Sequence, residues 1–476
     1  MKKTIPPIDE TRDSRRDFLK KGAMATAAVV TGYASVSEAA ATVSKAPAVA
    51  SSILGANDRL VIGFVGVGGQ GFHSHLQNVI NRGDNGEARH DFQYNAAGVA
   101  ACDLFSKRRD RALAALNGAQ TAGGSEASAE VYEDYRALID RQDIDAIFIG
   151  AVDHWHADIA IDAMQSGKHV YCEKPMTRYL DEAFRIYDTV KETGKKFQVG
   201  SQYCTEGKWH LAADLVRQGK IGKLVMAQDS YMRNTPSGEW NYYEIEPELQ
   251  PGVTIDWEKW LGHVGSRPFN AEHYHRWRKY YPYCAGILGD LLAHRIHPLL
   301  IGTGNPEFPM RVVCLGNKKV GDEVVGPQDR DVPDNIQLLA EFPSGLCIVV
   351  TGATVNEQGL PQVIRGNEAT LVLGDDTLEM RPERPFADLV DQELHTNLKP
   401  GPDIPAHIDN FFTAIREDGD TNGNIEIAVR AQAIISMAEM SERLGEMIHF
   451  DEKTRTLSTG SGKPLEPITY GTFEQS

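Results

Sequence analysis

Residues 59–71, RLVIGFVGVGGQG, decide the fold of this chain. The apolar run at 59–65 predicts a buried strand, and residues 73–80 can continue as a helix. Between them, Gly66, Gly68 and Gly71 form a G-x-G-x-x-G loop, whose glycines let the backbone approach a pyrophosphate at a helix N-terminus. A glycine-rich turn is the alternative, but the position between a strand and a helix favours a dinucleotide-binding loop.

An acidic residue after the next strand bears on which dinucleotide binds. The run at 95–101 predicts a second strand, which is followed closely by Asp103. A carboxylate there can bind the ribose hydroxyls, which favours NAD over NADP. The spacing from the glycine loop exceeds the usual ~20 residues because residues 83–93 form an inserted polar loop. The basic residues at 107–109 can meet a 2′-phosphate instead, so NADP stays open.

Two further predicted strands carry polar side chains at their ends. The apolar run at 144–150 leads into Asp153 and His156, and the run at 168–172 leads into Glu173-Lys174-Pro175. Strands that alternate with helices form a parallel sheet, and ligands bind beyond the C-terminal ends of its strands. We therefore expect Asp153, His156 and Glu173 to bind the cofactor together with the three glycines.

The second half of the chain has a different pattern. Its β-like segments are 222–232, 311–315, 336–342, 346–354 and 370–373, with a predicted hairpin around Pro343-Ser344-Gly345. The sequence thus predicts an α/β protein: an N-terminal Rossmann domain with a parallel sheet (58–180) and a C-terminal α+β domain with a large, mainly antiparallel sheet (181–450). We expect helices between 407 and 444 to pack back on the first domain, and 451–476 to be a tail.

The first forty residues have the three parts of an export signal. Arg15 and Arg16 precede Phe18-Leu19, an apolar stretch covers 22–34, and a small-residue site follows. We expect a twin-arginine signal peptide at 1–40, read by the twin-arginine translocation machinery, then a linker at 41–57 and a periplasmic protein. Leader cleavage and retention as an anchor are both open. Free NAD(P) is scarce outside the cytoplasm, so we expect the cofactor to stay bound.

Composition excludes some classes of partner. The chain has 476 residues, too many for one core, and a formal net charge of −17 from 49 Lys+Arg and 66 Asp+Glu. A chain this acidic, without a Lys/Arg-rich block, is a poor ligand for nucleic acid or anionic membranes. None of the six cysteines forms a C-x-x-C pair. We therefore expect no zinc ribbon or thioredoxin-like site. Because twin-arginine cargo folds in a reducing compartment before export, we also expect mostly free, buried thiols.

The glycine loop, Asp153–His156, Glu173-Lys174-Pro175 and Gly289-Asp290-x-x-x-His294 together resemble the Gfo/Idh/MocA family of glucose-fructose oxidoreductase and inositol dehydrogenase. The likeness runs from about residue 59 to 445. It implies that Lys174 lies between nicotinamide and substrate, that Asp290 and His294 complete the catalytic set, and that no metal is required. It also implies a homodimer or homotetramer formed through a free sheet face.

One position departs from the family pattern. Where many members have Asp three residues after the catalytic histidine, this chain has His297. Asp290, His294 and His297 lie at i, i+4 and i+7, on one face of a predicted helix. Asp290 can position and His294 can act as acid/base with Lys174. A metal site with these three residues as ligands is geometrically possible, and it is the least favoured of the interpretations. For His297 two interpretations stay open, a substrate contact and a packed helix residue.

Aromatic residues point to a sugar ligand. All six tryptophans fall within 155–277, and the run at 273–281 (HYHRWRKYY) is especially dense. Sugars bind aromatic faces flanked by hydrogen-bonding groups, although aromatic side chains are more often core. Trp277 and Tyr281 are the candidate substrate contacts that we take from this run.

Three functions compete on these motifs. The leading one is a sugar or polyol oxidoreductase with a retained NAD(P), which passes hydride between substrates. The second is a glycosidase that uses bound NAD transiently: it oxidises a ring carbon, eliminates the glycoside and reduces the carbon again. The third is a non-catalytic sugar-binding protein, against which Lys174, Asp290 and His294 argue. The first two need the same residues, so the motifs do not separate them, and the sugar itself is not readable.

Overall fold

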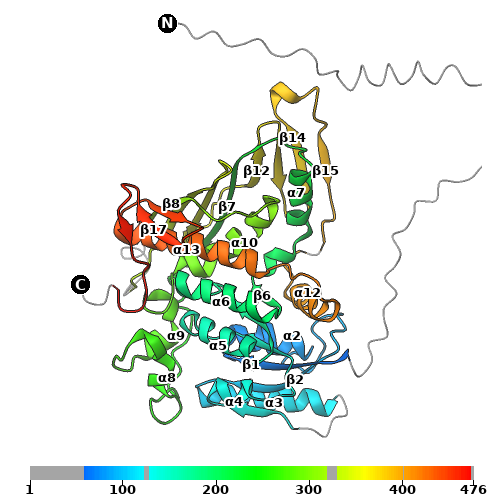
Figure 1. Ribbon diagram of the computed structural model, residues 1–476. Helices are drawn as coiled ribbons and strands as arrows, with labels where there is room; N and C mark the ends of the chain where they lie inside the picture. The colour runs from blue at the N-terminus through cyan, green and yellow to red at the C-terminus, as the bar shows by residue number, and fades with distance from the viewer. Residues whose placement is uncertain (1–57, 123–127, 319–329, 400, 473–476) are drawn as a thin grey trace, which may run out of the picture.

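The computed structural model describes residues 58–122, 128–318, 330–399 and 401–472. The expected leader (1–40) and linker (41–57) lie outside the described residues. Within those ranges no helix is both long and apolar enough to cross a membrane. Two sheets organise the fold, a parallel one in the lower half of Figure 1 and a larger one above it.

The first sheet is parallel throughout. Its strands are β1 (Leu60–Val65), β2 (Ala96–Cys102), β3 (Glu130–Tyr132), β4 (Ala146–Ile149), β5 (His169–Glu173) and β6 (Phe197–Gly200). They lie in the order β3-β2-β1-β4-β5-β6. Because the order reverses beside β1, the C-terminal ends of β1, β2 and β4 border a crevice. The predicted Rossmann fold is confirmed.

Helices cover both faces of this sheet. Those of the first domain are a π-helical segment (Gly71–Leu76) that continues into α2 (Gln77–Val79), then α3 (Ser106–Ala122), α4 (Tyr135–Ile139), α5 (Asp153–Gln165) and α6 (Leu180–Thr193). Along β4, Ile147 and Ile149 belong to one buried cluster and Phe148 to another. This alternation explains why the parallel strands read as continuous apolar runs.

The first domain extends beyond residue 180, where the sequence analysis ended it. β6 pairs in parallel with β5, with Phe197 opposite Val170. All four residues of β6 are buried. A short strand that is buried on both faces has no alternation to mark it in the sequence, and this explains the displaced boundary.

A helix from the far end of the chain completes the first domain. In α12 (Ile404–Glu417), Ile408, Phe411 and Phe412 are buried in the same cluster as Phe64 and Phe148. Figure 1 shows α12 beside the first sheet, although α12 follows β6 by about 200 residues in the sequence. α12 therefore belongs structurally to the Rossmann domain.

The second sheet holds the remaining strands. They are β7 (Leu224–Asn234), β8 (Arg311–Asn317), β9 (Asn335–Glu341), β10 (Cys347–Ala353), β11 (Val355–Asn356), β12 (Gln362–Gly366), β13 (Ala369–Leu373), β14 (Leu378–Pro382), β15 (Glu393–His395), β16 (Ile448–Asp451), β17 (Thr456–Thr459) and β18 (Pro464–Leu465). Their order is β15-β14-β13-β12-β7-β10-β9-β8-β16-β17-β18, with β11 paired to β7.

This sheet confirms the predicted, mainly antiparallel second domain. Among the strand pairs that the structure describes, only β7 and β10 run parallel. The predicted hairpin is β9–β10, with Leu338 opposite Val350.

Helices pack against one face of the second sheet. They are α7 (Gly207–Arg217), α10 (Ala293–Gly302) and α13 (Ile425–Leu444); α8 (Trp257–Leu261) and α9 (Ala271–His275) lie beside the first domain. Single 3₁₀ turns occur at Gln202–Thr205, Gly262–Val264, Trp277–Lys279 and Arg384–Phe386, and a π-helical segment at Leu288–Leu292. α13 crosses between the two sheets (Figure 1).

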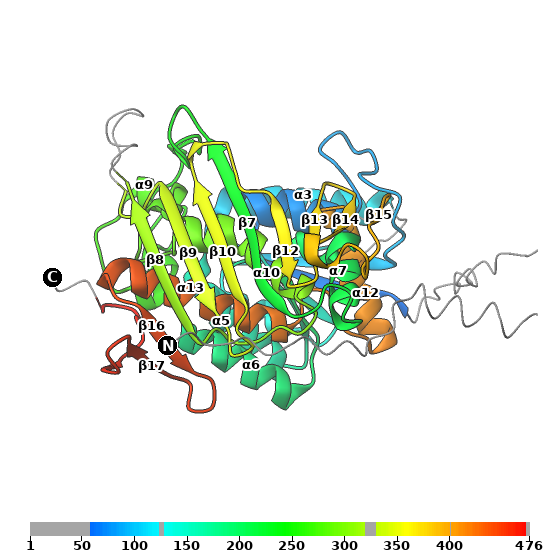
Figure 2. The same ribbon diagram turned by 90° about the horizontal axis from the view of Figure 1, so that it is seen from above.

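The other face of the second sheet has no described helix over it, as Figure 2 shows. On β8, β9 and β10, Val313, Leu339 and Val349 lie opposite one another. Leu339 is 44% exposed. An apolar cross-strand row therefore lies on the open face.

The segment that the sequence analysis assigned to a tail (451–476) takes part in the fold. β17 and β18 extend the second sheet beyond β16. The Tyr470 hydroxyl donates a 2.7 Å hydrogen bond to Oε1 of Glu182 in α6. The tail interpretation is corrected on this point, because strands of four and two residues are too short to show a periodic pattern.

Candidate active site

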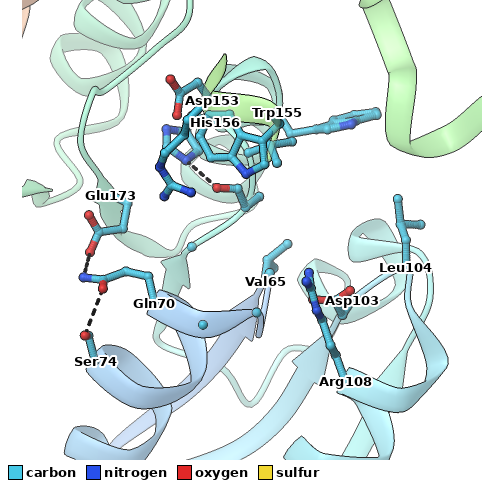
Figure 3. Close-up of a pocket in the computed structure, with 18 of the residues that line it drawn as sticks. Val65, Gln70, Ser74, Asp103, Leu104, Arg108, Asp153, Trp155, His156 and Glu173 are labelled. Atoms are coloured by element: carbon cyan, nitrogen blue, oxygen red, sulfur yellow. Dashed lines mark hydrogen bonds between the residues drawn. The ribbon is translucent and has the colours of Figure 1, made fainter. Parts of the chain in front are cut away.

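A cavity of about 990 Å³ lies beyond the C-terminal ends of β1, β2, β4 and β5. The first domain lines it with the glycine loop, Asp103 and Glu173, and the second domain with Trp277 and Asp290. Figure 3 shows part of this lining, with Gln70 beside Glu173 and Asp103 beside Arg108. Its position is the one at which open parallel sheets bind ligands, and its volume suits a large ligand.

The loop after β1 requires glycine at two positions. Gly66 has a φ of +79°, and a Cβ there would collide with the backbone of Ala151. A Cβ on Gly71 would collide with the carbonyl oxygen of Gly66. Gly68 lines the cavity, and a Cβ on it would lie 3.1 Å from Nη1 of Arg108. The loop thus presents bare backbone to the cavity, as a pyrophosphate requires.

Asp103 shapes this loop as well as lining the cavity. Its Oδ2 accepts a hydrogen bond from the Val67 N–H (3.0 Å), and its Oδ1 accepts one from the Phe105 N–H (2.9 Å). The carboxylate therefore ties the end of β2 to the glycine loop. It also occupies the position from which an acidic residue binds ribose hydroxyls.

Of the three basic residues at 107–109, two are engaged by other protein groups. Lys107 Nζ pairs with Oε2 of Glu246 at 2.7 Å, and Arg109 donates to two backbone carbonyls of the turn between β2 and α3. Arg108 lines the cavity with its guanidinium 4.9 Å from the ring centroid of Tyr274. Arg108 is thus placed to meet a nucleotide.

Glu173 connects the end of β5 to the glycine loop. Its Oε1 accepts hydrogen bonds from Gln70 Nε2 (2.8 Å; Figure 3) and from His75 Nε2 (2.9 Å), and its Oε2 accepts one from the Lys174 N–H (3.2 Å). Burial favours the neutral acid. The hydrogen bond and charge of His75 and the charge of Lys174 outweigh burial and lower the pKa of Glu173 to about 2. Glu173 is therefore ionised at neutral pH.

The start of α5 contributes two groups to the cavity lining, His156 and Asp153. His156 is buried, with Nδ1 2.8 Å from the Pro175 carbonyl oxygen and Nε2 3.1 Å from that of Ala151. Asp153 lines the cavity, and burial raises its pKa to about 8 against the opposing charges of Arg278 and Lys174. Asp153 is mostly protonated at neutral pH, and a protonated carboxyl can donate a hydrogen bond.

Lys174 and Asp290 meet across the two domains. Lys174 Nζ donates to Oδ1 and to the backbone carbonyl of Asp290, both at 2.7 Å. Arg278 Nε donates to the same Oδ1 (3.0 Å), and Trp240 Nε1 donates to Oδ2 (3.1 Å). Burial opposes ionisation, but the charges of Lys174 and Arg278 hold the pKa of Asp290 well below its usual range. Asp290 is a carboxylate that fixes the Lys174 ammonium at the cavity.

Trp240 is held in an unfavourable backbone conformation. Its φ is +68°, and its side chain is almost fully buried. A left-handed backbone in a residue other than glycine costs about 1–3 kcal/mol and persists where the surroundings enforce it. Here Arg330 donates to the neighbouring Glu239 carbonyl (2.9 Å), and the indole reaches Asp290.

His294 lines the same cavity from the first turn of α10. Its ring packs against Tyr203 (5.3 Å between centroids) and Tyr231 (6.0 Å). Its Nδ1 is buried without a hydrogen-bond partner among the described residues. Burial, and then the charge of Lys174, lower the pKa of His294 well below its usual range. The imidazole is therefore neutral at neutral pH and can accept a proton.

The three candidate substrate contacts separate in the structure. Trp277 lines the cavity with Arg278 over its ring, 4.2 Å from the centroid. Tyr281 and His297 are not among the lining residues. The Tyr281 hydroxyl donates to Glu442 (2.7 Å), and His297 Nδ1 lies 2.6 Å from the Ala293 carbonyl oxygen inside α10. The π-helical segment before α10 changes the angular spacing on which the predicted shared face rests.

The sequence analysis noted the tryptophans and the aromatic run at 273–281, but it assigned no individual role to four residues of the site: Gln70, His75, Trp240 and Arg278. Gln70 occupies an unspecified position of the glycine motif, and His75 lies one turn into the following helix. Trp240 and Arg278 come from segments without a periodic pattern. Their contacts with Asp290 arise only when the two domains pack together.

Metal ligands do not gather in the part of the chain that the structure describes: no group of three or more His, Cys, Asp or Glu could hold an ion. All six cysteines are free, and five are buried. The expectation of mostly free, buried thiols is confirmed.

Two family models match this chain. One, an oxidoreductase family with an NAD-binding Rossmann fold, matches residues 60–201. The other, the C-terminal alpha/beta domain of an oxidoreductase family, matches residues 238–462. Together they span most of the chain and both sides of the cavity.

The curated relatives reported below are named as glycosidases. A glycosyl hydrolase family 109 protein of Shewanella baltica is 30% identical over 240 residues, which are 49% of this chain and 48% of that protein. An alpha-N-acetylgalactosaminidase of Shewanella oneidensis is 28% identical over 246 residues, 48% of this chain and 50% of that protein. The chain spans about half the length of the curated relatives it matches.

Solved structures share the fold. Levoglucosan dehydrogenase, in complex with NADH and levoglucosan, has a TM-score of 0.58 at 20% identity and covers 82% of this chain and 99% of its own. Aldose-aldose oxidoreductase from Caulobacter crescentus, complexed with glycerol, has a TM-score of 0.57 at 16% identity, with 82% and 100% covered. At these identities the likeness establishes the architecture.

Proposed function

Because the chain belongs to the Gfo/Idh/MocA oxidoreductase family, we propose that it is an NAD-dependent oxidoreductase acting on a CH–OH group of a sugar or polyol. When bound, NAD supplies the hydride acceptor for such a reaction. The observation that carries the proposal is that Lys174, Asp290 and His294 line the same cavity as the glycine loop. Hydride transfer from an alcohol needs a cofactor and proton-transferring groups together.

The residues present fit a dinucleotide. The bare backbone at Gly66, Gly68 and Gly71 would hold the pyrophosphate. Asp103 would contact the ribose, and Arg108 lies at the same end of the cavity (Figure 3). A cavity of about 990 Å³ has room for a dinucleotide beside a small substrate.

Side chains of the protein can accept and donate the proton of the substrate hydroxyl. The hydroxyl loses its proton as its carbon loses hydride, and His294, which lines the cavity with Lys174, is placed to take part in that proton transfer. Lys174, fixed by Asp290 at 2.7 Å, can exchange a proton with the hydroxyl or donate a hydrogen bond to its oxygen. Asp290 itself acts by holding Lys174 in place.

The test is Lys174→Met, which keeps the length of the side chain and removes its charge. We expect kcat to fall by about 10²–10⁴-fold, the usual contribution of a proton-transferring group, with NAD still bound. Lys220→Met is the control, because Lys220 forms a partly exposed pair with Glu393 in the second sheet. Wild-type turnover of the Lys174 variant on every sugar tested would refute the assignment.

In an exported protein the cofactor would stay bound between turnovers. The paired arginines at 15–16 support export through the twin-arginine machinery to the periplasm, with the leader cleaved or kept as an anchor. Full-length protein from an exporting host should release about one NAD or NADP per chain on denaturation, identified by mass. A protein that is empty and binds NAD(P) weakly would refute retention and leave a dehydrogenase with an exchangeable cofactor.

The second candidate is an NAD-dependent glycosidase, favoured by the names of the curated relatives. Oxidation of a ring hydroxyl acidifies the neighbouring C–H, loss of that proton expels the glycoside, and water addition and reduction restore the sugar. Such a reaction releases an aglycone without net redox change, and in D₂O the sugar product gains deuterium at the acidified carbon. The oxidoreductase instead yields a ketose or lactone without that exchange.

The assembly would be a homodimer or homotetramer that pairs the open faces of the second sheets. The apolar row Val313, Leu339 and Val349 supports this, because a partly exposed apolar row on a sheet gains from burial. A second copy of this chain is the occupant that we propose for the face.

A further inference from the structure

Two adjacent tyrosines at the cavity have no role in the reaction described above. Tyr242 is 47% exposed and Tyr243 is 37% exposed, and both line the cavity. Their ring centroids are 4.8 Å apart. Large aromatic side chains left open to solvent inside a ligand cavity mark a binding surface.

The chain holds this pair in a fixed place. The Tyr242 hydroxyl donates to Oε1 of Glu239 (3.0 Å), which also pairs with Arg233 Nη1 (2.8 Å). The Tyr243 carbonyl accepts a hydrogen bond from Arg276 Nε (2.9 Å). A rigid aromatic surface loses little conformational freedom when a ligand binds it.

The same segment ties the pair to the catalytic carboxylate. Trp240, two residues before Tyr242, donates its indole N–H to Oδ2 of Asp290 (3.1 Å). Arg278 donates to Oδ1 of Asp290, and its guanidinium lies 5.8 Å from the ring centroid of Tyr243. The pair therefore adjoins the residues that hold Lys174, through the contact of Tyr243 with Arg278 and through the short chain segment that joins Tyr242 to Trp240.

The rest of this segment runs toward the nucleotide end of the cavity. Glu246 pairs with Lys107 at 2.7 Å, beside the end of β2. Tyr242 and Tyr243 instead make their contacts with Glu239 and Arg278 at the catalytic end. The placement argues for a substrate contact rather than a cofactor contact.

We propose that Tyr242 and Tyr243 form an outer subsite for a second ring linked to the reacting sugar, so that the substrate is a glycoside rather than a free monosaccharide. This rests on the proposed function. The apolar C–H face of a sugar, or an aryl aglycone, can pack on these rings. Arg233 and Glu244 line the cavity nearby and can bind its hydroxyls. A single ring held at Lys174 would leave both tyrosines uncovered.

The test compares glycosides that differ only in the second ring. The NAD-loaded full chain is titrated calorimetrically with methyl and 4-nitrophenyl α-glycosides of glucose, galactose and N-acetylgalactosamine. We expect tighter binding of the 4-nitrophenyl glycoside by about tenfold for the sugar that fits, from one aromatic contact. The ratio should approach one in Tyr242→Ala/Tyr243→Ala and persist in Tyr242→Phe/Tyr243→Phe, which keeps both rings.

Other results would overturn the subsite. These are equal affinities of the wild type for the 4-nitrophenyl and methyl glycosides, no binding of any probe, or a preference that the alanine variant retains. A loss of NAD affinity in the alanine variant as large as its loss of glycoside affinity would also overturn the subsite. Hydride transfer and 4-nitrophenol release are measured separately. A tyrosine-dependent preference without turnover refutes the proposed function and keeps the subsite. Turnover without a preference for the 4-nitrophenyl glycoside supports the proposed function and refutes the subsite.

Discussion

At Asp290, one carboxylate receives donors from three separate parts of the chain. Lys174 comes from the end of β5, Arg278 from the segment after α9, and Trp240 from the segment after β7. Hydrogen bonds to charged groups are worth about 1.5–3 kcal/mol each, so the orientation of this carboxylate is strongly specified. Since Asp290 in turn fixes Lys174, Arg278 and Trp240 act on the reaction through Lys174.

Trp240→Phe should therefore lower kcat. The substitution keeps an aromatic ring and removes the N–H that orients Asp290. We expect kcat to fall about 10- to 100-fold, equivalent to the lost hydrogen bond, with little change in bound NAD. Steady-state kinetics with the best sugar measures it.

Trp209→Phe is the matched control. Its indole is equally buried, but it donates to Glu206 (2.7 Å), which does not line the cavity, whereas Trp240 donates to Asp290, which does. It should cost stability and leave kcat in place. If both variants lose only stability, Trp240 has a packing role and does not position Asp290.

Asp153 should make stability depend on pH. Its folded pKa is about 8 against an unfolded value of about 4. Between these values the unfolded chain ionises while the folded one keeps its proton, so Asp153 lowers the free energy of unfolding as pH rises, by up to about 1.4 kcal/mol per pH unit, and the effect levels off above pH 8. In Asp153→Asn, urea unfolding from pH 4 to 9 should lack this slope; an identical slope contradicts the shifted pKa.

At the scale of elements, the glycine loop and β5 act as one unit. The loop supplies Gln70, the helix after it supplies His75, and both donate to Glu173 at the end of β5. The ring of His75 also packs on Phe148 and Tyr171. The segment expected to hold phosphate is thereby joined to the segment that carries Lys174.

His75→Phe should weaken the chain in acid. Glu173 has a folded pKa of about 2, below its unfolded value, so its stabilisation is present above about pH 4 and is lost as pH falls toward 2. Without His75 the pKa of Glu173 rises, and the acid-unfolding midpoint should move to higher pH. Circular dichroism between pH 2 and 6 measures the midpoint. His449→Phe on β16 is the control, and equal midpoints for all three proteins would contradict the role of His75.

The elements that the sequence predicted are those with strong local patterns. β1 with its glycine loop, the ends of β4 and β5, and the β9–β10 hairpin each combine an apolar run with a turn signal. Lys174 lies at the end of β5, where the sequence pattern placed it, whereas Asp290 and His294 were expected from the family resemblance. β6, β17 and β18 are too short to show periodicity, and Trp240 and Arg278 meet Asp290 only through domain packing. Local sequence patterns thus predicted the strands and their motifs. The residues that hold the site in place come together only through long-range contacts, which no local pattern shows.

At the scale of the whole molecule, the two sheets have different surroundings. The first sheet and its helices border one side of the cavity, and segments inserted around the second sheet border the other. The second sheet keeps its far face open (Figure 2). We therefore expect substitutions on the open face to leave the geometry of the cavity unchanged.

Leu339→Glu should convert the proposed oligomer to monomer. It places a carboxylate in the centre of the row formed with Val313 and Val349, where pairing of two faces would bury it. Sedimentation equilibrium measures the mass. Leu389→Glu, at a residue that is 56% exposed outside this row, should leave the mass unchanged. A wild-type protein that is already monomeric would refute the assembly.

The position of α12 in the sequence determines when, during synthesis, folding of the first domain can be completed. The ribosome delivers this helix roughly 200 residues after β6, a delay of about 10–40 s at common rates of synthesis. During that interval Phe64 and Phe148 lack the cover that Phe411 and Phe412 provide. The nascent Rossmann half therefore leaves part of its core uncovered until α12 has been translated, and the first domain is completed only after most of the second domain has been synthesised.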